Sequence, residues 1–107
     1  MSDVEKGSTN VYADLGYPDA GEMQVKAQLV TKIKEIIQAR GWTQQDAAIV
    51  LGMPQPKLSN VLRGQFRGVS EAKLMECLTR LGRRVQIVVG PARQADDVSH
   101  VEVVFAG

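Results

Sequence analysis

The chain has 107 residues and a net charge of +1, with 44% hydrophobic and 23% charged residues. This length is enough for one domain but not for two separate cores, and the composition is that of a folded protein. One cysteine and one histidine exclude an intramolecular disulfide and a Cys/His zinc finger, and we expect no metal and no cofactor. No apolar run approaches the roughly 20 residues that span a bilayer, so we expect a cytoplasmic protein without a membrane partner.

The charges are distributed unevenly along the chain. Residues 40–84 contain eight basic and three acidic residues, a net charge of +5, whereas residues 1–39 and 85–107 each have a net charge of −2. A basic middle segment between acidic ends indicates a surface for a polyanion. A solvated face with scattered lysines and arginines would give the same charge, so the charge alone leaves both interpretations open.

A long helix is expected after a disordered tail at residues 1–10. Asp19 has the character of a helix cap, with Glu22 at the capping-box spacing, and Gly41 ends the helix. The apolar residues of this helix fall at spacings of three and four, which leaves Lys26 on the polar side. The apolar stripe consists of Leu29, Val30, Ile33, Ile36 and Ile37.

Two short helices follow. Thr43 is a typical cap for a helix over residues 44–51, and Gly52 ends that helix. Pro54 opens the next helix, which runs to Leu62, because proline is tolerated in a first turn whose N–H groups have no acceptor. The expected inner faces of these helices comprise Ala47, Ala48, Leu51, Leu58, Val61 and Leu62.

The C-terminal part contains one more helix and then changes its period. Ser70 is a strong cap for a helix over residues 71–81, whose inner face includes Leu74, Met75, Leu78 and Leu81. Residues 84–89 and 98–105 alternate with a period of two and are rich in β-branched side chains, which predicts two strands. Two strands are marginal alone in water, so we expect them to pair within the chain or with a second copy as a dimerisation element.

The most informative pattern lies between residues 43 and 64. Two short helices joined by a tight glycine turn form a helix-turn-helix, in which the small Ala47 and Ala48 allow a close crossing. No acidic residue occurs from Gly52 to Gly68, as expected of an element that approaches phosphate. The outer positions of the second helix are all capable of hydrogen bonds: Gln55, Lys57, Ser59, Asn60 and Arg63.

Several short motifs carry a resemblance to a known family. In the central region they are Thr43-Gln44, Ala47, Leu51-Gly52, Gln55, Leu58-Ser59, Leu62 and Gly64. With these residues the chain resembles the Xre-type helix-turn-helix of phage repressors and bacterial antitoxins. The flanks are similar to the host-inhibition-of-growth (HigA-like) branch of antitoxins. The motifs that carry this similarity are Asp14-Leu15-Gly16, Lys26-Ala27-Gln28-Leu29 and Leu81-Gly82-Arg83-Arg84-Val85.

The resemblance implies a mainly α fold. The expected architecture is a four- to five-helix, phage-repressor-like domain over residues 11–82, followed by a short two-stranded β element over residues 83–107. The residues before the first long helix, 11–18, would pack onto the helical body. In this family the helix at residues 55–63 lies in the major groove of double-stranded DNA.

The resemblance also implies a role for each residue. Gln55 would read a base edge, with adenine as its natural partner, and Gln44 would contact a phosphate and brace Gln55. Lys57 and Ser59 would lie near the bases. Pro56 departs from the family pattern, in which a small polar residue is common, and offers only an apolar contact. The full expected DNA-binding set is Thr43, Gln44, Gln55, Pro56, Lys57, Ser59, Asn60, Arg63, Gln65 and Arg67.

The remaining members of this set are expected at phosphates. These are Asn60 and Arg63, joined by Gln65 and Arg67 of the following loop. The alternative for the glutamines is an ordinary surface position, and for the cations a solvated rim. Ser59 and Asn60 could instead bond the helix backbone.

These observations favour a sequence-specific transcriptional regulator, with repression as the expected action, that binds a palindromic operator as a homodimer. The alternative is an antitoxin that neutralises an mRNA-cleaving toxin of the RelE/HigB-like class and regulates its own operon, its acidic ends complementing a basic enzyme. We expect no catalytic residue, because Cys77 and His100 lie on separate elements and form no nucleophile–base pair. Cys77 is expected to be a buried packing residue.

Overall fold

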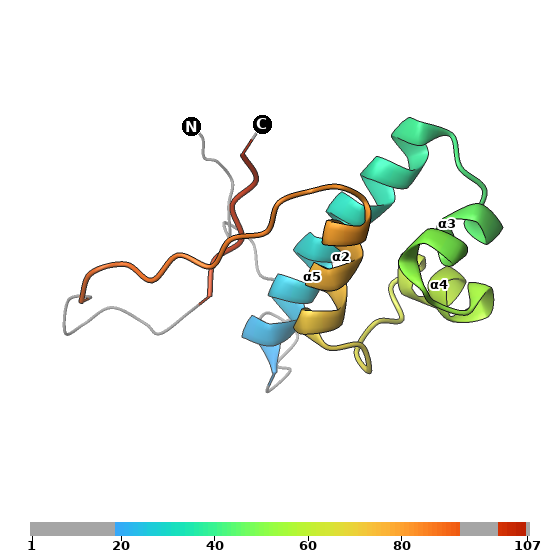
Figure 1. The fold of residues 1–107 in the computed structure, drawn as a ribbon. Helices are drawn as coiled ribbons and strands as arrows, with labels where there is room; N and C mark the ends of the chain where they lie inside the picture. The colour runs from blue at the N-terminus through green and yellow to red at the C-terminus, as the bar shows by residue number, and fades with distance from the viewer. Residues whose placement is uncertain (1–18, 93–100, 107) are drawn as a thin grey trace.

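The computed structural model describes residues 19–92 and 101–106, and this part of the chain is mainly helical. Helix α2 packs against α5, and α3 packs against α4 at one end of that pair (Figure 1). The order and bounds agree with the expected helices to within about one residue at each end. The helices are α2 (Ala20–Arg40), α3 (Gln44–Leu51), α4 (Gln55–Leu62) and α5 (Glu71–Arg80).

Local interactions define the ends of the helices. The hydroxyls of Thr43 and Ser70 each accept a hydrogen bond from a backbone N–H three residues later, at 3.1 and 3.0 Å, which confirms both predicted caps. Gly41 and Gly52 have φ angles of +68° and +66° and end α2 and α3. Glycine adopts this left-handed conformation without the steric cost that a Cβ would impose.

The start of α2 differs from the expectation at two residues. Asp19 occupies the cap position, but its side chain makes no capping hydrogen bond and pairs with Arg67 instead. Lys26 is only 3% exposed, and its Nζ lies 2.9 Å from the Glu22 carboxylate and 2.8 Å from the carbonyl oxygen of Arg67. The predicted capping box and the polar-face position of Lys26 were therefore wrong. Both side chains find partners more than 40 residues away, which a local pattern does not reveal.

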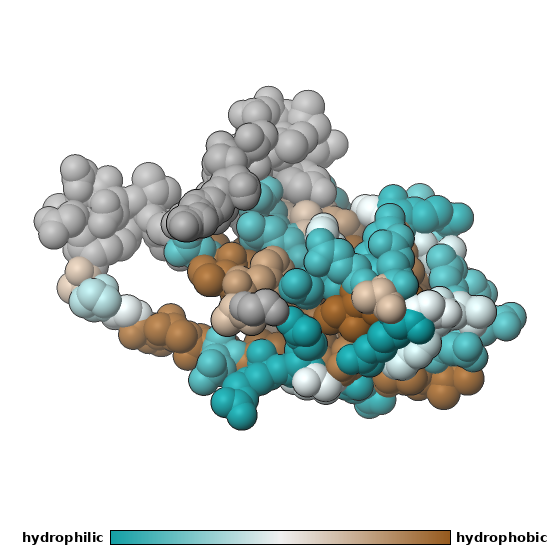
Figure 2. Space-filling view, turned by 90° about the horizontal axis from the view of Figure 1, so that it is seen from above, coloured by the Kyte–Doolittle hydropathy of each residue, from teal (hydrophilic) through white to brown (hydrophobic). Residues whose placement is uncertain are grey.

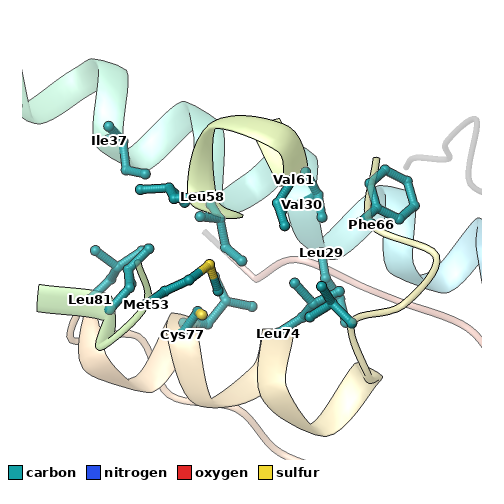
Figure 3. Close-up of a cluster of buried hydrophobic side chains, with 14 of the residues drawn as sticks. Leu29, Val30, Ile37, Met53, Leu58, Val61, Phe66, Leu74, Cys77 and Leu81 are labelled. Atoms are coloured by element: carbon teal, nitrogen blue, oxygen red, sulfur yellow. The ribbon is translucent and has the colours of Figure 1, made fainter. Parts of the chain in front are cut away.

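An apolar cluster fills the space between the four helices, and α2, α4 and α5 all contribute to it (Figure 3). Leu58 and Val61 are 1% and 2% exposed and attach α4 to the body by its inner face. Leu62 and Met75, both expected inside, are half-buried at the edge of the cluster. Cys77 is buried, and this burial raises the pKa of its thiol, which confirms its role as a packing residue.

Residues 83–92 leave the helices as a chain without secondary structure (Figure 1). The predicted strand at 84–89 is not formed in the single chain, because a strand needs a partner for its backbone N–H and C=O groups. Ile87, Val88 and Val89 are 80%, 86% and 89% exposed. Figure 2 shows apolar surface on the part of the chain that extends away from the helical body.

The last described segment, residues 101–106, also contains no strand. Val103 is half-buried against the core, and the ammonium of Lys32 lies 5.0 Å from the centre of the Phe105 ring. This end of the chain therefore returns to α2. The start of the second predicted strand lies outside the described residues, as do the tail expected at 1–10 and the packing expected of residues 11–18.

We expect Gly52→Ala to lower the free energy of unfolding by about 1–2 kcal/mol, because its left-handed φ is costly for any residue with a Cβ. The added Cβ would also lie 3.0 Å from Nη1 of Arg80, whose guanidinium donates to the carbonyl of Val50 at 3.4 Å. Urea denaturation followed by circular dichroism measures the change.

Gly21→Ala is the matched control. A Cβ at Gly21 meets nothing within 4 Å, and alanine favours a helix over glycine by up to about 1 kcal/mol. We expect this variant to be as stable as the original chain or more so. Equal stability of the two alanine variants would contradict the importance of the Gly52 turn.

Candidate nucleic-acid interface

Helix α4 turns its polar residues away from the core. Leu58 and Val61 are buried, whereas Lys57 on the same helix and Arg63 at its end are exposed. The ten residues predicted to bind DNA all have exposed or half-buried positions, and none is enclosed by the fold. The half-buried members are Gln55, Ser59 and Asn60, and the exposed ones are Thr43, Gln44, Pro56, Lys57, Arg63, Gln65 and Arg67.

A hydrogen bond joins the first residues of the two short helices. Nε2 of Gln55 donates to Oε1 of Gln44 at 3.2 Å, across eleven residues of sequence. Thr43 caps α3 directly before Gln44, and Pro54 occupies the cap position of α4 directly before Gln55, without a side-chain capping bond. The two amide groups therefore lie side by side at the surface where α3 and α4 begin.

A second pair lies at the other end of α4. The guanidinium of Arg63 donates from Nη2 to Oδ1 of Asn60, one helical turn earlier. Asn60 thus bonds a side chain, and its amide nitrogen and the other N–H groups of Arg63 remain as donors. Two polar pairs therefore border the outer face of α4, one at each end.

The loop after α4 is attached to the core by two buried side chains. Phe66 and Val69 are 4% and 5% exposed and anchor it in the core. Gln65 between them and the helix is exposed, while the side chain of Arg67 pairs with Asp19 at the start of α2. The hydrogen bond from Arg67 is the main cause that lowers the pKa of the Asp19 carboxyl.

Helix α4 and the loop after it contribute only positive charges to this surface, while Asp46 in the first turn of α3 and Asp19 beside Arg67 add acidic groups. From Ala47 to Ser70 the chain has three basic residues and no acidic one. The three basic residues are Lys57, Arg63 and Arg67. A surface of this kind, with amide groups between cations, can bind a phosphate backbone and present hydrogen-bonding groups to base edges.

Three residues that support this surface were not found from the sequence. Asp19 and Lys26 hold the loop, and Arg80 of α5 bonds both Glu76 and the carbonyl of Val50 near the end of α3. Apart from Glu22, which pairs with Lys26, and Glu76, which pairs with Arg80, their partners are 30 to 48 residues away. Charge and periodicity alone carry no signal for such pairs, because the fold creates them.

Two further observations concern other classes of site. Within residues 19–92 and 101–106, no group of three or more histidine, cysteine, aspartate or glutamate side chains could hold a metal ion. None of the helices there is long and apolar enough to cross a membrane.

The capped helix α3, the left-handed turn at Gly52 and the outward-facing helix α4 define a helix-turn-helix protein. Residues 11–90 match the family described as helix-turn-helix domain, and the chain belongs to this family. A solved structure assigned to the XRE family of transcriptional regulators is similar, with a TM-score of 0.76 and 32% sequence identity over 83% of this chain and 100% of that chain. No curated protein sequence matches the chain.

Proposed function

We propose that the protein is a sequence-specific DNA-binding transcriptional repressor whose helix α4 lies in the major groove. The observation that carries the proposal is the hydrogen bond between Gln44 and Gln55 at the exposed start of α4, next to a segment, residues 47–70, that has no acidic residue. The similarity to a protein assigned as an XRE-family transcriptional regulator supports the same function.

The bond to Gln44 leaves Gln55 suited to one base. It uses one of the two amide hydrogens of Gln55 and leaves the other hydrogen and Oε1 unused. One donor and one acceptor on the same amide are what adenine N7 and N6–H require for a bidentate contact. Gln44 would keep this amide in plane, and its own amide nitrogen would donate to a phosphate beside the start of α3.

The other expected DNA-binding residues would surround this contact. Lys57 and Ser59 would lie near the bases and Pro56 against a thymine methyl group, with Thr43 at the backbone beside Gln44. Phosphates would be bound by Asn60, Arg63, Gln65 and Arg67, the last of which pairs with Asp19 in the single chain.

Gln55→Ala should reduce the preference for one base position by roughly 1–3 kcal/mol, because the variant loses the bidentate contact.

Arg63→Ala should weaken binding to all sequences alike and reduce the salt dependence, because a phosphate contact is lost. Titrations of the two variants against DNA from upstream of the gene, and against single-base variants of it, measure both effects.

Gln38→Ala and Lys34→Ala are the matched controls, since both residues are exposed on α2. We expect neither to change DNA binding by more than about twofold, because surface positions outside the contact carry little of the affinity. Wild-type binding that does not depend on salt, or unchanged base preference in Gln55→Ala, would contradict the proposal.

The repressor would act as a homodimer on a palindromic operator. Two copies of α4 related by a two-fold axis would then lie roughly 34 Å apart, one turn of B-DNA. The exposed apolar segment Ile87–Val89 supports a pairing surface, because such a segment is covered when two chains form a small β-sheet across the axis. In this proposal the strands predicted from the sequence form between chains.

Ile87→Lys should convert the dimer into a monomer at micromolar concentration, because it places a charge within the paired apolar segment. Sedimentation equilibrium measures the mass. Ile49→Lys is the matched control, since Ile49 is 79% exposed on α3, away from this segment. A wild-type chain that sediments as a monomer would contradict the dimer.

An antitoxin is the second candidate function. The acidic ends of the chain, each with a net charge of −2 over residues 1–39 and 85–107, favour contact with a basic partner. We expect a small basic protein of the RelE/HigB-like class to be encoded beside this gene and to co-purify with the chain. A gene that stands alone would favour the repressor without a toxin.

A further inference from the structure

The segment after α5 is anchored to the helical body by three contacts before it leaves that body (Figure 1). The backbone N–H of Arg83 donates back to a carbonyl of α5 at 3.0 Å. The guanidinium of Arg40, at the end of α2, donates from Nη2 to the carbonyl oxygen of Leu81 at 2.5 Å. Val85 is half-buried against the core, whereas residues 86–92 are all exposed. These three contacts therefore decide the direction in which the exposed part departs.

Gly82 lies between the two hydrogen bonds and is the hinge of this segment. Its φ angle is +85°, and a Cβ at this position would meet nothing within 4 Å. Because glycine has access to many backbone conformations, the peptide groups on both sides of it must be held to give one direction. The Arg83 bond is made within the end of α5. Among the described residues, the Arg40 bond is the one hydrogen bond that joins residues 81–92 to another helix.

The side chain of Arg40 is itself fixed by an aromatic ring. Cζ of its guanidinium lies 5.0 Å from the centre of the Trp42 ring. Trp42 packs against the core, and its backbone N–H donates to the carbonyl oxygen of Ile37 at 3.3 Å. A guanidinium stacked on an aromatic face keeps its N–H groups directed outward in its own plane. The exit of the segment therefore depends on a side chain 41 residues before Leu81.

We propose that Arg40 sets the separation of the two copies of α4 in the dimer, by fixing the direction in which residues 83–92 leave each helical body. This inference rests on the proposed homodimer, in which residues 87–89 of two chains pair, and adds a positioning residue outside the DNA interface. The paired segments define the two-fold axis, and the Gly82 hinge relates that axis to α4. With the hinge held, the two copies of α4 keep one separation, which matches one half-site spacing.

The first test measures this separation in the free dimer. A spin label on Ile49→Cys, at a position of α3 that is 79% exposed, reports the distance between the two copies by double electron–electron resonance. The chain with Arg40 should give one narrow distance peak. Arg40→Met should widen this peak about twofold or more, because the glycine hinge then moves. Sedimentation should show a dimer in both cases, since the pairing segment is unchanged. The chain without Ile49→Cys is the labelling control, because Cys77 is buried.

The second test measures the preference for half-site spacing on DNA. Duplex DNA from upstream of the gene is compared with duplexes that gain or lose one base pair at the centre of the palindrome, a change of about 3.4 Å and a tenth of a turn. The wild-type chain should lose about tenfold or more in affinity, because the second half-site is then engaged only with strain. Arg40→Met should bind the original duplex about threefold or more weakly, since its α4 helices are less preorganised. Its loss on the changed duplexes should be less than about threefold.

Lys34→Met is the matched control, because it removes the same charge from an exposed position on α2. It should equal the wild-type chain in distance peak, mass and spacing preference. A folded, dimeric Arg40→Met whose distance peak and spacing preference are unchanged would overturn the inference. A broad distance distribution in the chain with Arg40 would also overturn it, and this measurement decides the case if Arg40→Met does not fold.

Failure of the underlying proposals gives different results. A wild-type chain that sediments as a monomer would overturn the dimer and this inference with it. A narrow distance peak that Arg40→Met widens, in a chain that binds none of the duplexes, would support the positioning role of Arg40 and overturn the proposed DNA-binding function alone.

Discussion

Leu58 and Val61 bury the inner face of α4 in the core, and the candidate interface depends on this attachment. A helix of eight residues is too short to be stable alone in water, so its orientation must come from packing. The left-handed turn at Gly52 brings α4 back against α3, where Ala47, with no exposed surface, leaves room for a close approach. With the inner face fixed in this way, the polar residues of α4 have a defined direction.

Polar contacts around α4 add to the support that this packing provides. The bond from Gln55 to Gln44 restricts a flexible side chain before any ligand arrives, which reduces the entropy lost on binding. At the other end, the core anchors Phe66 and Val69 and the buried amine of Lys26 hold the loop that follows α4. The helix is thus supported at its start by the Gln44–Gln55 pair and at its end by groups that need not touch DNA themselves.

The local parts of this structure could be predicted from the sequence because each is decided by a few neighbouring residues. Thr43 and Ser70 cap their helices through bonds to backbone groups three residues away, and Gly52 ends α3 by a property of its own backbone. The helix-turn-helix and its polar outer face followed from the same short segment. The apolar periodicity of α2 likewise gave its buried side, except at Lys26.

The remaining parts could not be predicted because their causes are distant in the sequence. Lys26 looks like a surface lysine until the fold brings the carbonyl of Arg67, 41 residues later, to its amine. Asp19 looks like a helix cap until Arg67 competes for its carboxylate. Residues 84–89 do alternate with the period of a strand. A strand forms only when its backbone pairs with another strand, and none is present in the described part of the single chain.

A nuclear magnetic resonance titration of the chain with duplex DNA from upstream of the gene tests the central claim most directly. The account predicts that the largest shifts fall on the backbone of α4 and on the side-chain amides of Gln44 and Gln55, with smaller shifts in the loop around Gln65. Shifts confined to residues 83–92, with α4 and both amides unchanged, would contradict it.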